Sequence, residues 1–189
     1  MLYSPEPPPA PAVTIDGEVF DLYISSAQIA ARVDELGKQL ERDYAGKTPV
    51  VVGVLNGAAV FLADLIRAAE SLDMELDFYR LSSYGDKKIS SGEIRKLKDV
   101  DISLVGRDVI VVEDVIDSGL SVKYIRDDVA RRNPKSLRFC ALLYKEGVAQ
   151  LDFEIDYIGF KIPKQFVIGY GLDIAEKKRN LKGIYRLRV

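Results

Sequence analysis

The chain has 189 residues, of which 48% are hydrophobic and 30% are charged, and its formal net charge is −2. This balance is typical of a soluble globular domain with enough apolar material for a core, and the lack of net positive charge disfavours a nucleic-acid partner. Histidine is absent, which excludes histidine-based triads, histidine general bases and most zinc sites. Acid–base chemistry therefore falls to carboxylates, lysine or tyrosine.

The first residues are rich in proline: five of the eight prolines lie in MLYSPEPPPAPAV. This start lacks the basic region and apolar stretch of a signal peptide, and no apolar run is long enough to span a bilayer. We predict a polyproline-type arm over residues 1–12, followed by a single domain over residues 13–189. The lone cysteine, Cys140, lies in an apolar run and is expected to be buried. Since one thiol cannot form an internal disulfide, we expect a reducing, cytoplasmic location and no membrane partner.

Along the domain, helical and strand patterns alternate. Ser25 and Gln28 form a capping-box pattern, and apolar residues at helical spacing follow it (Ile29, Val33, Leu36 and Leu40). Strands are predicted at 49–55, 75–84, within 109–122, at 136–144 and, as shorter pieces, at 156–160, 166–170 and 183–189, and helices from about Gly57 to 72 and over 121–133. The polar stretch 85–99 predicts a long loop that ends in a short returning strand, and loops of this length are often lids.

The alternation predicts an α/β fold with a central, mostly parallel sheet flanked by helices. Ligands of such sheets bind outside the carboxyl ends of the strands. The stretch VIVVEDVIDSGLSV, residues 109–122, brings a buried strand to such an end with Glu113, Asp114 and Asp117, followed by a turn of small residues. The functional site is therefore expected there.

The turn Asp117-Ser118-Gly119-Leu120-Ser121 precedes a helix. Free N–H groups and the helix dipole favour an anion at a helix start, and glycine permits close backbone approach. The sequence contains neither a Walker P-loop nor a dinucleotide-binding glycine pattern, so a phosphomonoester is the favoured ligand. The alternative is a simple helix cap, in which Asp117 or Ser118 satisfies the free N–H groups.

Glu113 and Asp114 have no basic neighbour in the sequence. On an extended chain their carboxylates point to opposite faces, where they could bind vicinal sugar hydroxyls or hold Mg²⁺, a hard cation that favours oxygen ligands. Asp117 lies beyond them, where it could accept a proton. A capping role explains one acid but not three acids beside a glycine–serine turn.

These residues resemble the phosphoribosyl-pyrophosphate (PRPP) motif of type I phosphoribosyltransferases. The rest of the chain resembles the hypoxanthine-guanine branch of that family: VLNGAAVFLADL its pyrophosphate loop, LSSYGD the start of its flexible loop, and LLYKEG and YIGFKIPKQFVIGYGLD its purine-binding hood. The resemblance runs from Val13 to the C-terminus in the same order. It implies a type I phosphoribosyltransferase fold with a small hood and a flexible loop from Ser82 to about Arg95.

The resemblance implies roles at the sugar and phosphate end. Glu113 and Asp114 would bind the ribose hydroxyls with Mg²⁺ nearby, and Asp117 would handle the purine N7 proton. The 5′-phosphate would lie on Asp117, Ser118, Gly119, Leu120 and Ser121. The pyrophosphate would meet Leu55, Asn56, Gly57 and Arg179, with a cis peptide between Leu55 and Asn56. Members often have lysine or arginine where this chain has Asn56, which keeps the backbone amide but removes a charge.

At the purine end, the resemblance implies that Lys145 donates to the 6-oxo group, Phe166 stacks on the base, and the Val167 backbone reads its edge. Asp173 would lie there too and ligate a second Mg²⁺, while Ser83 and Tyr84 would close over the site. Each role has a structural alternative: Phe166 as core, Lys145 as a solvated lysine, Tyr84 packed on the sheet, and Asp173 as the cap of a short helix.

The implied activity is purine salvage, in which hypoxanthine or guanine and PRPP give IMP or GMP and pyrophosphate, with Mg²⁺ as cofactor and a homodimer or homotetramer as the assembly. One alternative is a PRPP-sensing regulatory protein on the same fold. It would not need Lys145, Phe166 and Asp173 at purine-reading positions. A phosphoacceptor receiver domain is another alternative, but the earlier strand at 49–55 lacks the acid pair that it needs.

Overall fold

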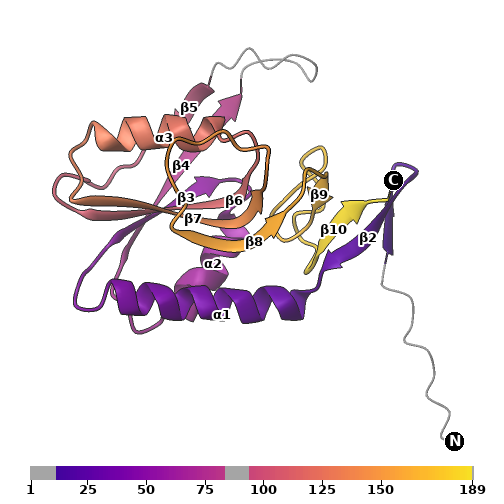
Figure 1. Cartoon of the computed structure of the whole chain (residues 1–189), viewed down its shortest axis with the longest axis horizontal. Coiled ribbons are helices and arrows are strands. Elements are labelled where there is room, and N and C mark those ends of the chain that lie inside the picture. Colours follow the sequence, from indigo (N-terminus) through magenta and orange to yellow (C-terminus); the bar gives the residue numbers. More distant parts are fainter. Residues whose placement is uncertain (1–11, 84–93, 189) are drawn as a thin grey trace, which may run out of the picture.

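A six-stranded sheet forms the centre of the molecule (Figure 1). The computed structural model describes residues 12–83 and 94–188. The strands lie in the order β5-β4-β3-β6-β7-β8, and all pairs are parallel except β4 with β5. Their bounds are β3 (Val50–Leu55), β4 (Glu75–Ser83), β5 (Ile94–Lys98), β6 (Asp108–Ile116), β7 (Ser136–Lys145) and β8 (Tyr157–Ile162). The predicted mostly parallel α/β sheet is confirmed.

Helices cover both faces of this sheet, with α1 (Ser26–Asp43) and α2 (Ala59–Ala68) on one side and α3 (Leu120–Ala130) on the other (Figure 1). The strands alternate accordingly: Val51 and Ile110 pack in the core with α1 and α2, whereas Val52 and Val111 pack with α3. Buried on both faces, these strands read as continuous apolar runs. This burial on both faces explains why the predicted strand at 49–55 lies in the centre of the sheet.

The start of α1 matches the sequence pattern. The Ser25 hydroxyl accepts from the Gln28 backbone at 3.3 Å, and the Gln28 side chain accepts from the Ser25 backbone at 2.9 Å, which completes the capping box. The four apolar residues expected on its inner face are all buried. Cys140 is also buried, and burial raises the pKa of its thiol. α2 begins at Ala59, two residues after the predicted Gly57.

A second sheet of four antiparallel strands forms the hood, in the order β1-β2-β10-β9 (Figure 1). It joins β1 (Ala12–Ile15) and β2 (Glu18–Ile24) to β9 (Val167–Ile168) and β10 (Ile184–Leu187). The C-terminal strands were predicted, but the hairpin of β1 and β2 was not. β1 begins at Ala12, the last residue of the predicted arm, and residues 1–11 lie outside the described part of the chain.

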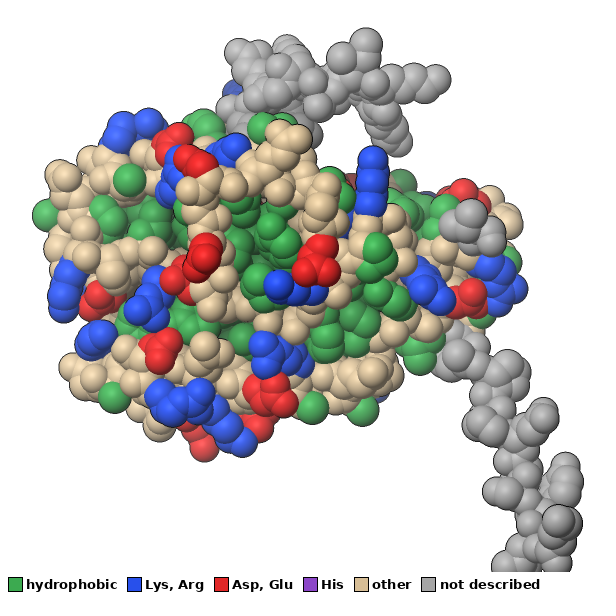
Figure 2. Space-filling view, viewed as in Figure 1, with side chains coloured by type: hydrophobic (Ala, Val, Ile, Leu, Met, Phe, Trp, Pro, Cys, Tyr) green, Lys and Arg blue, Asp and Glu red, His purple; other side chains and the backbone are tan. Residues whose placement is uncertain are grey.

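The returning strand predicted after the long polar loop is present as β5, which pairs antiparallel with β4. Residues 84–93 between them, including Tyr84, lie outside the described residues. On the face seen in Figure 2, lysine and arginine side chains are interspersed with aspartate and glutamate. Among the residues described, no helix has the length and apolar character to cross a membrane.

Candidate active site

The parallel pairing of β6 with β3 and β7 brings the carboxyl ends of these three strands together. β3 ends at Leu55, which a cis peptide joins to Asn56, as expected from the sequence. β6 carries Glu113 and Asp114 near its end, and β7 ends at Lys145. Residues far apart in the sequence thus meet at one edge of the sheet, the edge at which such folds bind ligands.

The turn after β6 leaves the start of α3 open. Gly119 occupies the N-cap with φ +85° and has no side chain to cap the helix; the Ser118 hydroxyl accepts a hydrogen bond from the Leu120 N–H at 3.4 Å. A cavity of about 80 Å³ lies within the turn, lined by residues 115–122. Asp117 does not cap the helix, because its carboxylate bonds to Lys145, whereas Ser118 satisfies the first N–H, as the capping alternative allowed. The free N–H groups suit an anion of phosphate size.

Gly119 is held close to the loop between β7 and β8. A Cβ at this position would lie 2.7 Å from the Leu151 side chain, and the left-handed backbone itself disfavours other residues. The Gln150 N–H donates to the Ser118 carbonyl at 3.3 Å. Leu151 and Gln150 therefore position the turn, a contribution that no pattern in the sequence indicates.

Asp117 and Lys145 form an ion pair. Lys145 Nζ donates to Asp117 Oδ2 at 2.6 Å. Lys145 is only 8% exposed, so it is not a solvated surface lysine, whereas half of the Asp117 side chain is exposed. The two residues assigned to the purine O6 and N7 are therefore directly hydrogen-bonded to each other.

Of the acid pair on β6, Glu113 is buried and Asp114 is partly buried. Glu113 is 6% exposed, and burial together with neighbouring Asp114 raises its pKa well above the usual range. Burial also raises the pKa of Asp114 to about 6, although the Val115 N–H and the Arg179 charge favour its ionised form. The Asp114 carboxylate lies against Gly57, where a Cβ would come within 1.7 Å of Oδ2. Any side chain at 57 would therefore displace this carboxylate from its position.

These residues fit a divalent cation, since neighbouring carboxylates on one strand, one buried and one partly buried, are stabilised by a nearby positive charge. Within residues 12–83 and 94–188, however, no three metal-ligating side chains converge, so Glu113, Asp114 and Asp173 do not form one cage. Mg²⁺ ordinarily takes one or two carboxylates and completes its shell with water and substrate phosphates. The neighbouring carboxylates of Glu113 and Asp114 agree with this mode of Mg²⁺ binding.

The hood supplies the other predicted residues. Phe166 is 48% exposed, with its ring 6.1 Å from that of Phe20, so it is not a core residue. Val167 is buried. Asp173 caps no helix; its Oδ2 accepts from the Glu176 N–H at 2.8 Å in a tight turn, and its Oδ1 contacts Arg179 at 3.0 Å. Ser83 is the last residue of β4 and pairs with Ile94.

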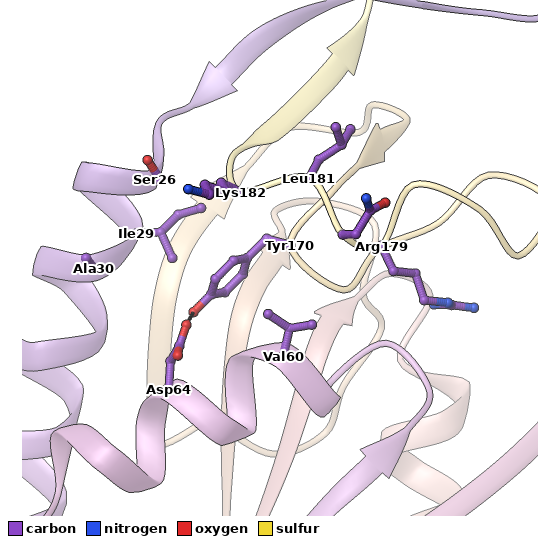
Figure 3. Close-up of a pocket in the computed structure, with 10 residues that line it drawn as sticks. Ser26, Ile29, Ala30, Val60, Asp64, Tyr170, Arg179, Leu181 and Lys182 are labelled. Carbon is purple, nitrogen blue, oxygen red and sulfur yellow. Dashed lines mark hydrogen bonds between the residues drawn. The ribbon is translucent and has the colours of Figure 1, made fainter.

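Arg179 is fixed beside the loop that follows β3. Its Nη1 donates to the Gly171 carbonyl at 2.8 Å, and the Gly171 N–H donates back to the Arg179 carbonyl at 2.9 Å. Gly171 in turn packs on Gly57, whose carbonyl would lie 2.1 Å from a Cβ at 171. Figure 3 shows the Arg179 side chain extending away from Tyr170 and Asp64, which are hydrogen-bonded to each other; all three line a cavity of about 310 Å³.

This combination of a parallel sheet, an acid pair at the end of β6, an open phosphate-sized turn and an antiparallel hood is that of a type I phosphoribosyltransferase. The family model described as "Phosphoribosyl transferase domain" matches residues 23–175, and the chain belongs to this family.

Known proteins agree with this assignment. The chain is 42% identical over 168 residues to the bifunctional protein TilS/HprT of Listeria monocytogenes, covering 89% of this chain but only 26% of that protein's length. It is 42% identical to the hypoxanthine-guanine phosphoribosyltransferase of Bacillus subtilis, covering 87% of this chain and 91% of the relative. The crystal structure of a Bacillus anthracis hypoxanthine-guanine phosphoribosyltransferase superposes with a TM-score of 0.83 at 45% identity, covering 89% and 98% of the two chains.

Proposed function

We propose that this chain transfers the 5-phosphoribosyl group from PRPP to hypoxanthine or guanine, giving IMP or GMP and pyrophosphate, with Mg²⁺ as cofactor. The observation that carries this proposal is the Lys145–Asp117 pair beside the open turn. It sets a hydrogen-bond donor and a proton acceptor side by side, as a 6-oxopurine needs at O6 and N7 when its ribose phosphate lies on the turn.

In the proposed reaction the C1′–O bond to pyrophosphate breaks, and purine N9 forms the new bond to C1′. The turn from Asp117 to Ser121 holds the 5′-phosphate through backbone N–H groups and serine hydroxyls. Glu113 and Asp114 orient the ribose through its hydroxyls, while Arg179 and the amides after β3 stabilise the charge that develops on the leaving pyrophosphate. Bound Mg²⁺ would supply positive charge to the carboxylates and to the pyrophosphate oxygens.

At the base, Phe166 offers a half-exposed ring on which a purine can stack. Lys145 has donors only, so it suits a 6-oxo group and opposes the 6-amino group of adenine. Asp117 accepts the N7 proton in this proposal. Binding by stacking and by Lys145 positions N9 for attack on C1′.

A spectrophotometric assay with PRPP, Mg²⁺ and each of hypoxanthine, guanine, xanthine and adenine tests the proposal. We expect turnover of hypoxanthine and guanine and very poor turnover of adenine. Adenine turnover equal to that of hypoxanthine would overturn the role of Lys145. Binding of PRPP without turnover of any base would instead favour the PRPP-sensing alternative.

We further propose a cytoplasmic location, in keeping with the single buried thiol, and self-association as a homodimer or homotetramer. Size-exclusion chromatography with light scattering distinguishes these assemblies from a monomer.

A further inference from the structure

A strained turn precedes Arg179. Ile174 and Lys177 exchange backbone hydrogen bonds of 3.1 and 3.0 Å, and between them Ala175 and Glu176 both have positive φ, 49° and 63°. Such two-residue turns usually contain asparagine and glycine, so non-glycine residues here are held by their surroundings. The bond from the Glu176 N–H to Asp173 Oδ2, at 2.8 Å, is one such restraint. The turn places the Glu176 side chain beside Arg179.

Two carboxylates neutralise Arg179. Its Nη2 lies 3.0 Å from Asp173 Oδ1 and 3.0 Å from Glu176 Oε2. The guanidinium is one-quarter exposed and is fixed next to Gly57 through Gly171, as described above. Arg179, the cation that Gly171 holds beside the proposed pyrophosphate loop, is therefore already paired with two negative charges.

The two carboxylates are not equivalent. Asp173 is partly buried and uses both oxygens, one for Arg179 and one for the turn, so its loss would disturb the backbone. The Glu176 side chain is 79% exposed, and its carboxylate contacts Arg179 alone among the described residues. An exposed ion pair of this kind contributes little to the free energy of unfolding. The Glu176 side chain can therefore leave Arg179 for solvent without disturbing the turn.

We propose that Glu176 is a displaceable counterion of Arg179. The Glu176 carboxylate pairs with the Arg179 guanidinium in the free protein and leaves it when pyrophosphate or the pyrophosphate group of PRPP binds. This inference rests on the proposed function and deepens it. An arriving polyanion competes with Glu176 for the same Nη2 donor, so Glu176 weakens pyrophosphate binding and favours its release after the reaction. Glu176 is a positioning residue that acts through Arg179.

Isothermal titration calorimetry of magnesium pyrophosphate tests the proposal through Glu176→Gln, which keeps the shape and removes the charge. We expect binding to tighten about two- to fivefold at low ionic strength, as for the loss of one exposed ionic contact, and the gain to shrink at high salt. The KM for PRPP should fall in parallel. Equal or weaker pyrophosphate binding by the variant would overturn the proposal, because a purely structural partner of Arg179 gives that result.

A matched control is available on α1. Arg32 and Glu35 are also an arginine–glutamate pair three residues apart, 2.5 Å between Nη1 and Oε2, and Arg32 Nε also donates to a backbone carbonyl, that of Gly159, at 2.9 Å. Glu35→Gln makes the same change in net charge and should leave pyrophosphate binding unchanged. If it tightens binding as much as Glu176→Gln, the effect is one of net charge and the proposal fails.

The failure of this inference and that of the proposed function give different results. A wild-type protein that binds neither pyrophosphate nor PRPP would refute the proposed function. A wild-type protein that binds and turns over PRPP, together with a Glu176→Gln variant that shows no tightening, would refute the counterion role alone.

Discussion

Replacing Asp117 with asparagine separates its chemical role from its structural one. Asparagine keeps the shape and can still accept a hydrogen bond from Lys145, but it cannot take a proton. If Asp117 is the general base, its loss should lower kcat by about 10²–10⁴-fold. PRPP affinity should change little, because Glu113 and Asp114 hold the sugar in the proposed site.

The structure also sets the expected cost in stability. The bond that this change weakens is charge-assisted, 2.6 Å long, and joins a buried lysine to a half-exposed carboxylate. A neutral acceptor keeps about half of such a bond, so we expect a loss of about 1 kcal/mol in the free energy of unfolding. For a domain of this size that corresponds to a fall in Tm of roughly 2–4 °C.

The assay compares kcat, KM for PRPP and Tm of purified Asp117→Asn with those of the wild type. Asp34→Asn is the control, because Asp34 also forms an ion pair with a lysine, Lys38, at 2.6 Å, but lies on α1 outside the proposed site. Near-normal kcat in folded Asp117→Asn would refute the base role and leave Asp117 as a structural partner of Lys145. A kcat loss of the same size in Asp34→Asn would show that the assay reports folding instead.

Two further predictions follow from buried carboxylates. Gly57→Ala places a Cβ 1.7 Å from Asp114 Oδ2. Because the end of the Asp114 side chain can move away, we expect little change in Tm, but the displaced carboxylate should lower kcat/KM for PRPP about 100-fold. Normal kinetics would contradict the role of Asp114. Burial opposes ionisation of Asp128, but hydrogen bonds from Tyr79, Lys96 and Arg132 outweigh it and lower its pKa to about 2. A pKa that is lowered on folding stabilises the folded protein at pH values above the pKa of the unfolded chain, which is near 4. On the order of 2 kcal/mol of the free energy of unfolding should therefore be lost as the pH falls from about 4 to 2. Urea unfolding across that range should show Asp128→Asn losing less stability than the wild type, and a gap between the two that does not change with pH would contradict this.

The parts of the fold predicted correctly from the sequence are those with strong local patterns. The buried strand β6 and the turn after it stand out because a continuous apolar run ends abruptly in acids and small residues. The start of α1 was predictable because a capping box involves neighbours three residues apart. In both cases the physical cause lies within a few residues.

The hood was only partly predictable. Its sheet pairs residues 20–24 with 184–187, and a contact between such distant segments leaves no local pattern. The hairpin of β1 and β2 did have a signal: Asp16 and Gly17, with φ 50° and 86°, form the two-residue Asp-Gly turn that is typical of hairpins.

The candidate site was also only partly predictable from the sequence. Its residue types could be assigned from the family resemblance, but their mutual contacts could not. The Lys145–Asp117 bond depends on the register of β6 against β7, and Glu176 looks like any other surface acid until the positive-φ turn places it on Arg179.

A crystal structure with IMP, Mg²⁺ and pyrophosphate tests the central claim most directly. The account predicts the 5′-phosphate on the turn Asp117 to Ser121, the purine O6 within hydrogen-bond distance of Lys145 Nζ, and the base against the ring of Phe166. A nucleotide bound elsewhere, or bound with its phosphate away from this turn, would contradict it.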